Sequence, residues 1–316
     1  MDLKSAAGSK IVILGAGGFL GLALARHAST IGHEVVCVSR SYQWQTNLLK
    51  SGVKCIEAQI CDVHQYLSAI TCGSSIVYMA GTTDLAKAEQ DGIQSIAAHL
   101  QDLAVLLQDL ADAKIHIHRF VLISSGGTVY GECSEEGANE LTTPLKPKSF
   151  YGLRNVFIEQ TAKMLCARAK YPLCILRLAN PYGIEQLEVR RKGLILSLFS
   201  SALTGTPAVL RGEGLQKRDY IYIEDVIKYI LSTIAEPFPV EYDVVNVCTG
   251  VSTSALELVR AIEFIAAKKV NVSCAVGQPA YEVASSVLER GKMSHAFDPS
   301  PLDACLGLLW KLLDSI

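Results

Sequence analysis

Short, mostly apolar runs recur at regular intervals along the first half of the chain. They cover residues 11–14, 34–40, 53–58, 75–79, 119–123 and 173–178, and several are rich in Val and Ile. Runs of this length between turn residues predict buried strands of a parallel sheet. Helical spacing of apolar residues predicts helices at 19–29, 65–70, 91–111 and 151–169. This alternation predicts an α/β protein with a Rossmann-like, doubly wound parallel sheet.

The regular alternation stops near Asn180. Before that point, 126–149 predicts a long loop, and loops of this length tend to be functional. Beyond it the pattern predicts helices at 192–202, 224–234, 255–267 and 302–314 and a strand at 244–247. We expect a dinucleotide-binding domain over residues 1–180, to which segments of about 215–250 return, and a smaller C-terminal substrate lobe over 181–316.

Four glycines separate the first predicted strand from the first predicted helix. Gly15 permits a tight turn, Gly18 lets a pyrophosphate approach the backbone, and Gly21 lets helix and strand pack closely, with Gly17 between them. The free N–H groups at the start of a helix bind phosphate. This spacing in this setting predicts a dinucleotide site.

The end of the second predicted strand bears on the choice of cofactor. An acidic residue there would bind the ribose hydroxyls and repel a phosphate, but the chain has Ser39 and Arg40. Because a guanidinium pairs well with a phosphate, this favours NADP over NAD. An Arg40 that stacks on adenine or is simply solvated remains an alternative.

Composition and charge exclude several classes of partner. The net charge is −2 with no basic run, so neither nucleic acid nor an anionic membrane is an expected partner. The apolar run 11–25 holds four glycines and is too short to span a bilayer. The ten cysteines are scattered singly, which favours reduced thiols in a cytoplasmic protein. His116 and His118 lack further ligands, so no metal site is expected.

Several motifs carry a family resemblance over nearly the whole chain. They are the glycine turn, VLISSGGTVYG at 121–131, Tyr151-Gly152, LRLANPYG at 176–183, RDYIYIEDV at 218–226 and NVCTG at 246–250. Together they resemble the extended short-chain dehydrogenase/reductase superfamily, specifically its nucleotide-sugar epimerase/dehydratase family. The resemblance implies hydride transfer between NAD(P) and a nucleotide-linked sugar. It also implies a homodimer formed through the helices at 91–111 and after Tyr151.

The resemblance also implies roles for individual residues. Tyr151 is the expected acid/base, and a Ser or Thr beneath the loop hydrogen-bonds the same substrate oxygen. Asn180 and Arg218 are the expected substrate contacts, although an ion pair of Arg218 with Asp219 or Glu224 is an alternative. The expected cofactor contacts are Gly15, Gly17, Gly18, Phe19, Leu20, Gly21, Ser39, Arg40, Asp62, Ala80, Gly81, Tyr151 and Asn155.

Four positions depart from the family pattern. Asn155 replaces the Lys that holds the nicotinamide ribose and stabilises the Tyr phenolate, and Gly126 occupies the usual Ser or Thr position. The neighbouring Ser125 or Thr128 could supply the hydroxyl. The other two departures are His99 for an Asn and Gln278 for an Arg.

The loss of the Lys matters most, because a free Tyr has a pKa near 10 and is a poor base at neutral pH. Arg154, three residues after Tyr151, is one source of the missing charge, and a solvent-facing Arg154 is the alternative.

Three functions remain open at this level. The first is an NAD(P)-dependent 4-epimerase, dehydratase or 4-keto reductase of a nucleotide-linked sugar. Arg40 and Asn155 favour reduction, whereas epimerisation is the commonest role in the resembling family. The second is a catalytically impaired NAD(P)-binding relative that acts as a sensor or partner subunit. The third is a reductase of a non-sugar ketone.

Overall fold

The computed structural model describes residues 8–41, 48, 52–81, 85–189, 193–236, 241–275, 277, 279–295 and 297–315. The chain divides into two compact units. Unit 1 contains the described parts of Met1–Ser125, Ser149–Arg177 and Ile227–Val245. Unit 2 contains those of Gly126–Lys148, Leu178–Val226 and Asn246–Ile316. The assignment of a dinucleotide domain and a substrate lobe to such units stays a prediction.

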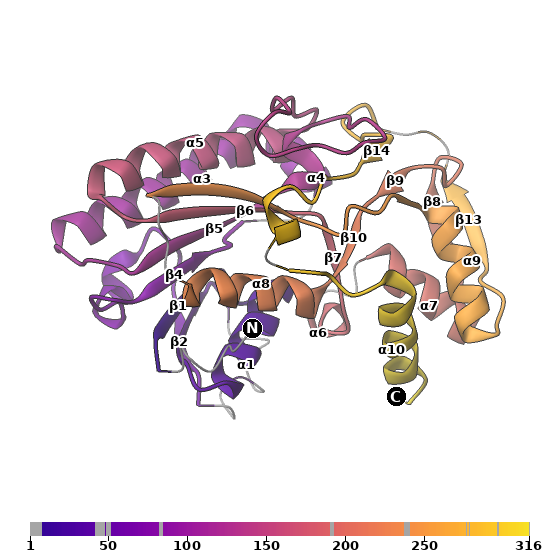
Figure 1. The fold of residues 1–316 in the computed structure, drawn as a ribbon, viewed down its shortest axis with the longest axis horizontal. Helices are drawn as coiled ribbons and strands as arrows, with labels where there is room; N and C mark the ends of the chain where they lie inside the picture. The colour runs from indigo at the N-terminus through magenta and orange to yellow at the C-terminus, as the bar shows by residue number, and fades with distance from the viewer. Residues whose placement is uncertain are drawn as a thin grey trace. The chain divides into compact units, whose positions relative to one another are not determined.

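A seven-stranded sheet is the centre of unit 1 (Figure 1). Its order is β11-β6-β5-β4-β1-β2-β3, and the pairs β1–β2, β1–β4, β2–β3 and β4–β5 are parallel. The strands are β1 (Lys10–Leu14), β2 (Glu34–Ser39), β3 (Lys54–Glu57), β4 (Ser75–Tyr78), β5 (Arg119–Ser125), β6 (Leu173–Leu178) and β11 (Tyr242–Val247). The chain reverses direction across the sheet between β1 and β4, and open α/β sheets bind ligands at such a point.

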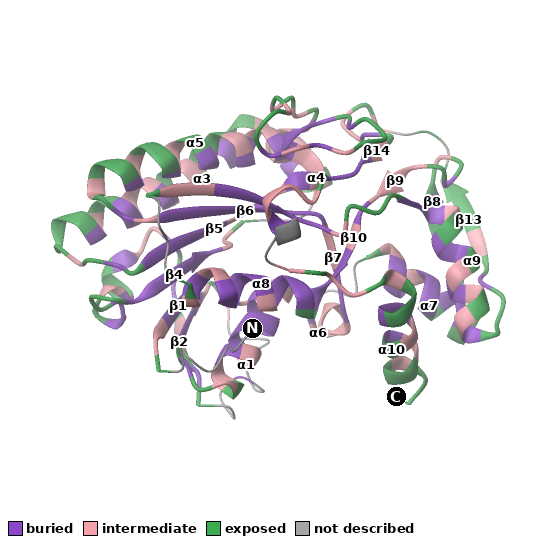
Figure 2. Cartoon of the chain, viewed as in Figure 1, coloured by how far each residue is buried: buried purple, intermediate pink, exposed green. Residues whose placement is uncertain are grey.

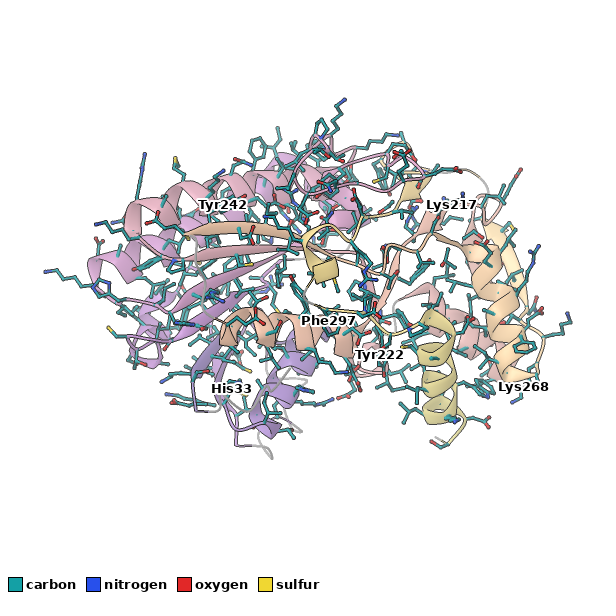
Figure 3. All side chains as sticks on the ribbon, in the orientation of Figure 1. His33, Lys217, Tyr222, Tyr242, Lys268 and Phe297 are labelled. Atoms are coloured by element: carbon teal, nitrogen blue, oxygen red, sulfur yellow. The ribbon has the colours of Figure 1, made fainter. Side chains whose placement is uncertain are left out.

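Three long helices connect these strands: α1 (Phe19–Thr30), α3 (Leu85–Asp112) and α5 (Phe150–Ala169). Helices α3 and α5 lie side by side (Figure 1). Helix α3 breaks at Gly92, where φ is 54° and ψ is −131°. On α5, the Lys163 ammonium lies 4.3 Å from the ring centre of Tyr242 on β11, which Figure 3 labels.

The sheet is buried because apolar side chains line its strands (Figure 2). One core cluster joins Val12, Val36 and Ile76 of the sheet to Leu103 of α3 and Ile158 of α5. Helices α3 and α5 thus share one buried layer with the strands, and their facing positions are fixed by apolar packing.

Unit 2 consists of shorter elements. They are α4 (Gly126–Val129), β7 (Asn180–Tyr182), α6 (Gln186–Val189), α7 (Leu194–Thr204), β8 (Ala208–Arg211), β9 (Lys217–Arg218), β10 (Tyr220–Tyr222), β12 (Thr253–Ser254), α9 (Ala255–Ala266), β13 (Val272–Ala275), β14 (Ser285–Ser286), η4 (Lys292–His295) and α10 (Leu302–Asp314). Helix α8 (Ile223–Ala235) begins in unit 2 and continues into unit 1. Small sheets pair β10 with β7, β12 and β14 with β9, and β13 with β8.

Two local predictions were wrong. Residues 65–70 form no α-helix, because the chain there makes two 3-10 turns, η2 (Val63–Gln65) and η3 (Leu67–Ala69). The predicted loop at 126–149 contains α4 directly after β5.

Candidate functional site

The glycine turn is a backbone arrangement in which side chains would collide. Gly15 has a φ of 91°, and a methyl group on it would lie 2.8 Å from the Cα of Ala80. A methyl group on Gly21 would lie 2.6 Å from the Cα of Ala16, and one on Gly17 would overlap the Ser39 hydroxyl. The carboxyl ends of β1, β2 and β4 therefore meet beside the glycine turn.

The start of α1 faces the same edge. Gly18 is its N-cap, and Phe19 and Leu20 are its first residues. The space beside Gly18 is open, since the nearest atom to a methyl group there would be the Gly15 carbonyl oxygen at 3.6 Å. A helix of 12 residues that begins here directs unbonded N–H groups and the positive end of its dipole at any phosphate in the turn.

Arg40 follows β2 and is exposed. Its charge acts on Asp102 of α3, as does the charge of Asp62, the N-cap of η2. Burial raises the pKa of Asp102, while the Cys61 thiol, His99 and Arg40 oppose that rise. Arg40 and Asp62 thus both lie close enough to Asp102 to change its pKa.

Tyr151 lies in the first turn of α5, which two contacts fix in place. The Gly152 amide donates to the Ser149 hydroxyl at 3.0 Å, so Ser149 caps the helix. The Phe150 amide donates to the Glu89 carboxylate of α3 at 2.5 Å. Tyr151 itself is half-buried.

Arg154 lies against Tyr151. Its guanidinium carbon is 4.7 Å from the centre of the Tyr151 ring, and the residue is only 3% exposed. The alternative of a solvent-facing Arg154 is therefore wrong. A methyl group on Gly81 would lie 3.3 Å from His99 Nε2 and 3.4 Å from Arg154 Nη2, so both side chains lie over this glycine.

Asn155 is buried on the same helix. Among the described residues its Nδ2 has no hydrogen-bond partner, which leaves a buried donor free for a ligand. The two candidate hydroxyl residues belong to different units. Ser125 ends β5 in unit 1, and Thr128 lies in α4 of unit 2. Gly126 is buried at the start of α4.

A buried charge network below Tyr151 was not predicted. Arg177 of β6 donates to Glu159 of α5 at 2.7 Å and 3.1 Å, and the Ser124 hydroxyl donates to the same carboxylate at 2.5 Å. The signal in the sequence was Arg177 within the otherwise apolar strand β6, because a buried charge needs a partner. The network ties α5 to β5 and β6.

The predicted substrate residues lie in unit 2. Asn180 Nδ2 donates to the Asp219 carbonyl at 3.0 Å. Arg218 donates to the carbonyls of Lys217 at 2.8 Å and Val283 at 2.9 Å; Figure 3 labels Lys217. The buried Asp219 carboxylate accepts from the Thr249 hydroxyl and from the Thr249 and Gly250 amides. The alternative of an ion pair between Arg218 and Asp219 is therefore wrong. Gln278 lies outside the described residues.

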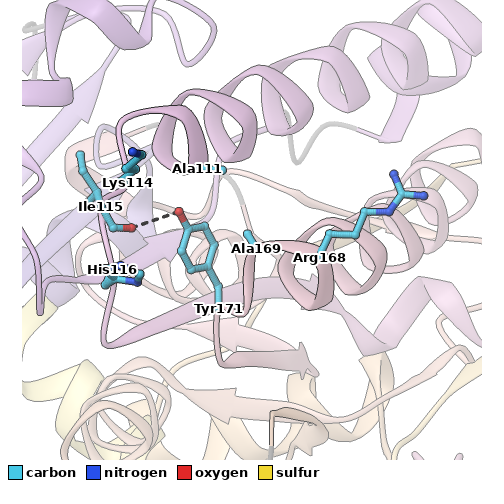
Figure 4. A pocket seen from close by; sticks show the side chains of 7 residues that line it. All are labelled: Ala111, Lys114, Ile115, His116, Arg168, Ala169 and Tyr171. Atoms are coloured by element: carbon cyan, nitrogen blue, oxygen red, sulfur yellow. Dashed lines mark hydrogen bonds between the residues drawn. The ribbon is translucent and has the colours of Figure 1, made fainter.

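Other features of unit 1 do not extend this site. A cavity of ≈ 410 Å³ lies at the ends of α3 and α5, lined by Ala111, Lys114, Ile115, His116, Arg168, Ala169 and Tyr171 (Figure 4). It borders the starts of β5 and β6, whereas the glycine turn follows the end of β1.

Within the described ranges, no three His, Cys, Asp or Glu side chains gather as metal ligands. No helix there is long and apolar enough to cross a membrane.

The residues present fit a dinucleotide. The glycine turn is a cradle that side chains would fill, α1 offers its N-terminus, and Asn155 Nδ2 is a buried donor without a partner in the part of the chain that the structure describes. The phosphates would lie at Gly15, Gly17, Gly18 and the start of α1. Ser39, Arg40 and Asp62 would hold the adenosine part.

Comparisons with known proteins identify the family of this chain. The model of the NAD dependent epimerase/dehydratase family matches residues 11–248. The chain is 28% identical to the Escherichia coli dTDP-4-dehydro-6-deoxyglucose reductase over 50% of this chain and 48% of that enzyme. It is 29% identical to the uncharacterized UDP-glucose epimerase YtcB of Bacillus subtilis over 65% of this chain and 62% of that protein. It therefore spans only about half to two thirds of these relatives.

Solved structures share the fold over almost the whole chain. The Thermotoga maritima UDP-glucose 4-epimerase with UDP-glucose has a TM-score of 0.87 at 21% identity and covers 97% of this chain and 99% of its own. The Thermus thermophilus UDP-glucose 4-epimerase in complex with NAD has a TM-score of 0.84 at 22% identity, covering 96% and 98%. The match of the family model over most of the sequence shows that this chain belongs to the NAD dependent epimerase/dehydratase family.

Proposed function

We propose that this chain is an NAD(P)-dependent enzyme that acts on a nucleotide-linked sugar as a 4-epimerase, dehydratase or 4-keto reductase. The carrying observation is that Tyr151, in the first turn of α5, lies against a buried cation in the unit that holds the glycine turn. A positioned phenol beside a positive charge is suited to general acid–base catalysis.

In this mechanism the chain's own residues move a proton and bind the cofactor and the substrate. When bound, the nicotinamide group supplies hydride donor and acceptor chemistry. Tyr151 accepts the proton of a sugar hydroxyl during oxidation and returns a proton to the carbonyl oxygen during reduction. Asn155 Nδ2 donates to a ribose hydroxyl, and Ser125 or Thr128 to the reacting sugar oxygen. Asn180 and Arg218 bind the nucleotide-sugar diphosphate, for which a planar guanidinium is suited.

Turnover of nucleotide sugars tests the proposal. UDP- and dTDP-linked hexoses and 4-keto-6-deoxyhexoses are incubated with the protein and NAD, NADH, NADP or NADPH, and the products are identified by NMR. Tyr151→Phe is expected to lose about 10²–10⁴-fold in turnover, as removal of a general acid–base group does. Tyr171→Phe, two residues beyond the C-terminal end of α5, serves as the control that keeps full activity. Full activity of Tyr151→Phe would remove Tyr151 from the mechanism.

A second candidate is an NAD(P)-binding relative without catalysis, acting as a sensor or partner subunit. Asn155 and Gly126 favour it, since both remove groups that the family pattern uses. It predicts cofactor binding with no turnover anywhere in the panel.

We also propose a homodimer. Ile93 of α3 is 72% exposed, and Phe157 and Met164, seven residues apart on α5, are 45% and 50% exposed. Such apolar side chains on adjacent helices are suited to a self-complementary helical interface.

A further inference from the structure

Arg154 is a charged residue in a place where charge is costly. It is only 3% exposed, and burial lowers the pKa of Arg154, while the phenols of Tyr151 and Tyr78 oppose that effect. Arginine is almost never buried so completely unless it has a partner, because its guanidinium loses its hydration. Buried ionisable groups beside a specific titratable partner are enriched at functional sites.

We propose that Arg154 provides the positive charge that stabilises the Tyr151 phenolate during proton transfer. This inference rests on the proposed function, which assigns the proton transfer to Tyr151. The guanidinium carbon lies 4.7 Å from the Tyr151 ring centre, so the two groups are in contact. An opposite charge within about 4–6 Å favours the ionised form of a group by about 1–3 pH units.

Within this inference His99 is the residue that positions Arg154, since both side chains lie over Gly81. Its Nδ1 lies 2.7 Å from the Ser95 carbonyl oxygen, and because a carbonyl only accepts, Nδ1 carries the proton. Nε2 of the neutral ring is then an acceptor, and it lies over Gly81 together with the Arg154 Nη2. Burial and the Arg154 charge lower the pKa of His99. A neutral His99 therefore adds no repulsion to the guanidinium.

The other charged groups around this pair come from three elements. Tyr78 ends β4 and acts on Arg154, and burial raises the pKa of Tyr78. Asp102, one turn after His99 on α3, and Arg40, after β2, act on His99 in opposite directions. The Asp102 charge raises the pKa of His99 and the Arg40 charge lowers it, so the two effects partly cancel.

The decisive experiment needs neither substrate nor cofactor. Tyrosinate absorbance near 295 nm is titrated with pH in the full chain and in Tyr151→Phe, and the difference isolates Tyr151 among 12 tyrosines. The same difference is measured with Arg154→Met in both proteins. The Tyr151 phenolate is expected to form at a pH about 1–3 units higher when Arg154→Met is present. Arg168→Met, an exposed position on the same helix, is the matched control and should leave the titration unchanged.

Two further variants keep the test interpretable. Arg154→Lys retains the charge, so its Tyr151 titration should stay within about one pH unit of the parent, even if Arg154→Met folds poorly. His99→Leu should move the titration in the same direction as Arg154→Met but by less. An unchanged titration in Arg154→Met, or an equal shift in Arg154→Lys, would overturn the inference.

Turnover separates the two proposals. If a nucleotide sugar is converted, the acidic limb of the pH–rate profile for oxidation should move to higher pH in Arg154→Met and stay in place in Arg168→Met. If no sugar is converted but the absorbance shift appears, the proposed function fails and the Arg154–Tyr151 coupling stands. If sugar is converted and neither measurement shifts, only the Arg154 inference fails.

Discussion

The positive charge and the amide donor of this site occupy adjacent positions on one helix. Arg154 contacts the Tyr151 ring, and among the described residues Asn155 Nδ2 has no hydrogen-bond partner. Under the proposed function, these two consecutive residues would divide the tasks that a single lysine performs in the family pattern. A guanidinium is planar and always charged, whereas an ammonium is a compact charge on a flexible stem.

Arg40 leads to a prediction about cofactor choice. We expect the chain to bind NADP about tenfold more tightly than NAD, and Arg40→Ala to lose this preference, because an exposed guanidinium pairs with a phosphate. Isothermal titration of both nucleotides with both proteins measures it. Asp102 and Asp62 act in the same neighbourhood and oppose the preference, so tighter binding of NAD would show that they dominate.

At the scale of elements, helix α5 is fixed by a helix cap, by apolar packing and by a buried ion pair. Ser149 caps its start, apolar residues such as Ile158 join the core, and Glu159 binds Arg177 and Ser124 beneath the site. Because Glu159 lies two turns after Tyr151, this network fixes the height and rotation of the helix relative to β5 and β6.

Glu159→Gln is predicted to destabilise the protein strongly. The side chains of Glu159 and Arg177 are 1% and 6% exposed, and removal of one charge leaves the other buried without compensation. The expected loss is about 3–5 kcal/mol in the free energy of unfolding. Urea denaturation followed by circular dichroism measures it. Lys87→Gln, which breaks the more exposed pair with Asp91, should change stability by less than about 1 kcal/mol.

At the scale of the molecule, two units carry different parts of the proposed function. Unit 1 contains the glycine turn, Tyr151, Arg154 and Asn155, and unit 2 contains Asn180 and Arg218. The exposed apolar side chains of α3 and α5 belong to unit 1, which therefore also holds the proposed dimer interface.

Light scattering tests that interface. We expect the parent chain to have twice the monomer mass at micromolar concentration, and Phe157→Glu combined with Met164→Glu to be monomeric, because buried carboxylates at an apolar interface are costly. Phe264→Glu on α9 is the control, since Phe264 is 88% exposed but lies in unit 2. A monomeric parent would rule out the dimer.

Acidification is predicted to destabilise unit 1 through His33. His33 is buried, its ring binds the Ser9 hydroxyl at 2.8 Å, and burial lowers the pKa of His33. Below about pH 6.5 the unfolded chain takes up a proton that the folded chain does not, so stability falls as pH decreases toward the folded-state pKa. Urea denaturation at pH 7.5, 6.5 and 5.5 should show a smaller loss in His33→Gln than in the parent. Parallel curves for the two proteins would contradict this prediction.

The sequence alone determined the features that depend on local chemistry. Apolar runs predicted the strands from β1 to β6, and the glycine spacing predicted the turn at Gly15. Both features depend on residues that are neighbours in the sequence. The short strands β9, β12 and β14 escaped prediction, since strands of two residues carry no periodicity.

Only the tertiary structure decided which side chains meet across long separations. The spacing on the helix allowed Arg154 to reach Tyr151 or to face solvent, and the fold placed it in the interior, over Gly81 together with His99 of α3. Likewise, Arg218 and Asp219 are adjacent in sequence, yet Arg218 donates to the Val283 carbonyl 65 residues away and Asp219 accepts from Thr249 30 residues away. The tertiary structure determines the partner of a charged side chain, because the free energy of desolvation depends on all the groups around the charge and not only on its sequence neighbours.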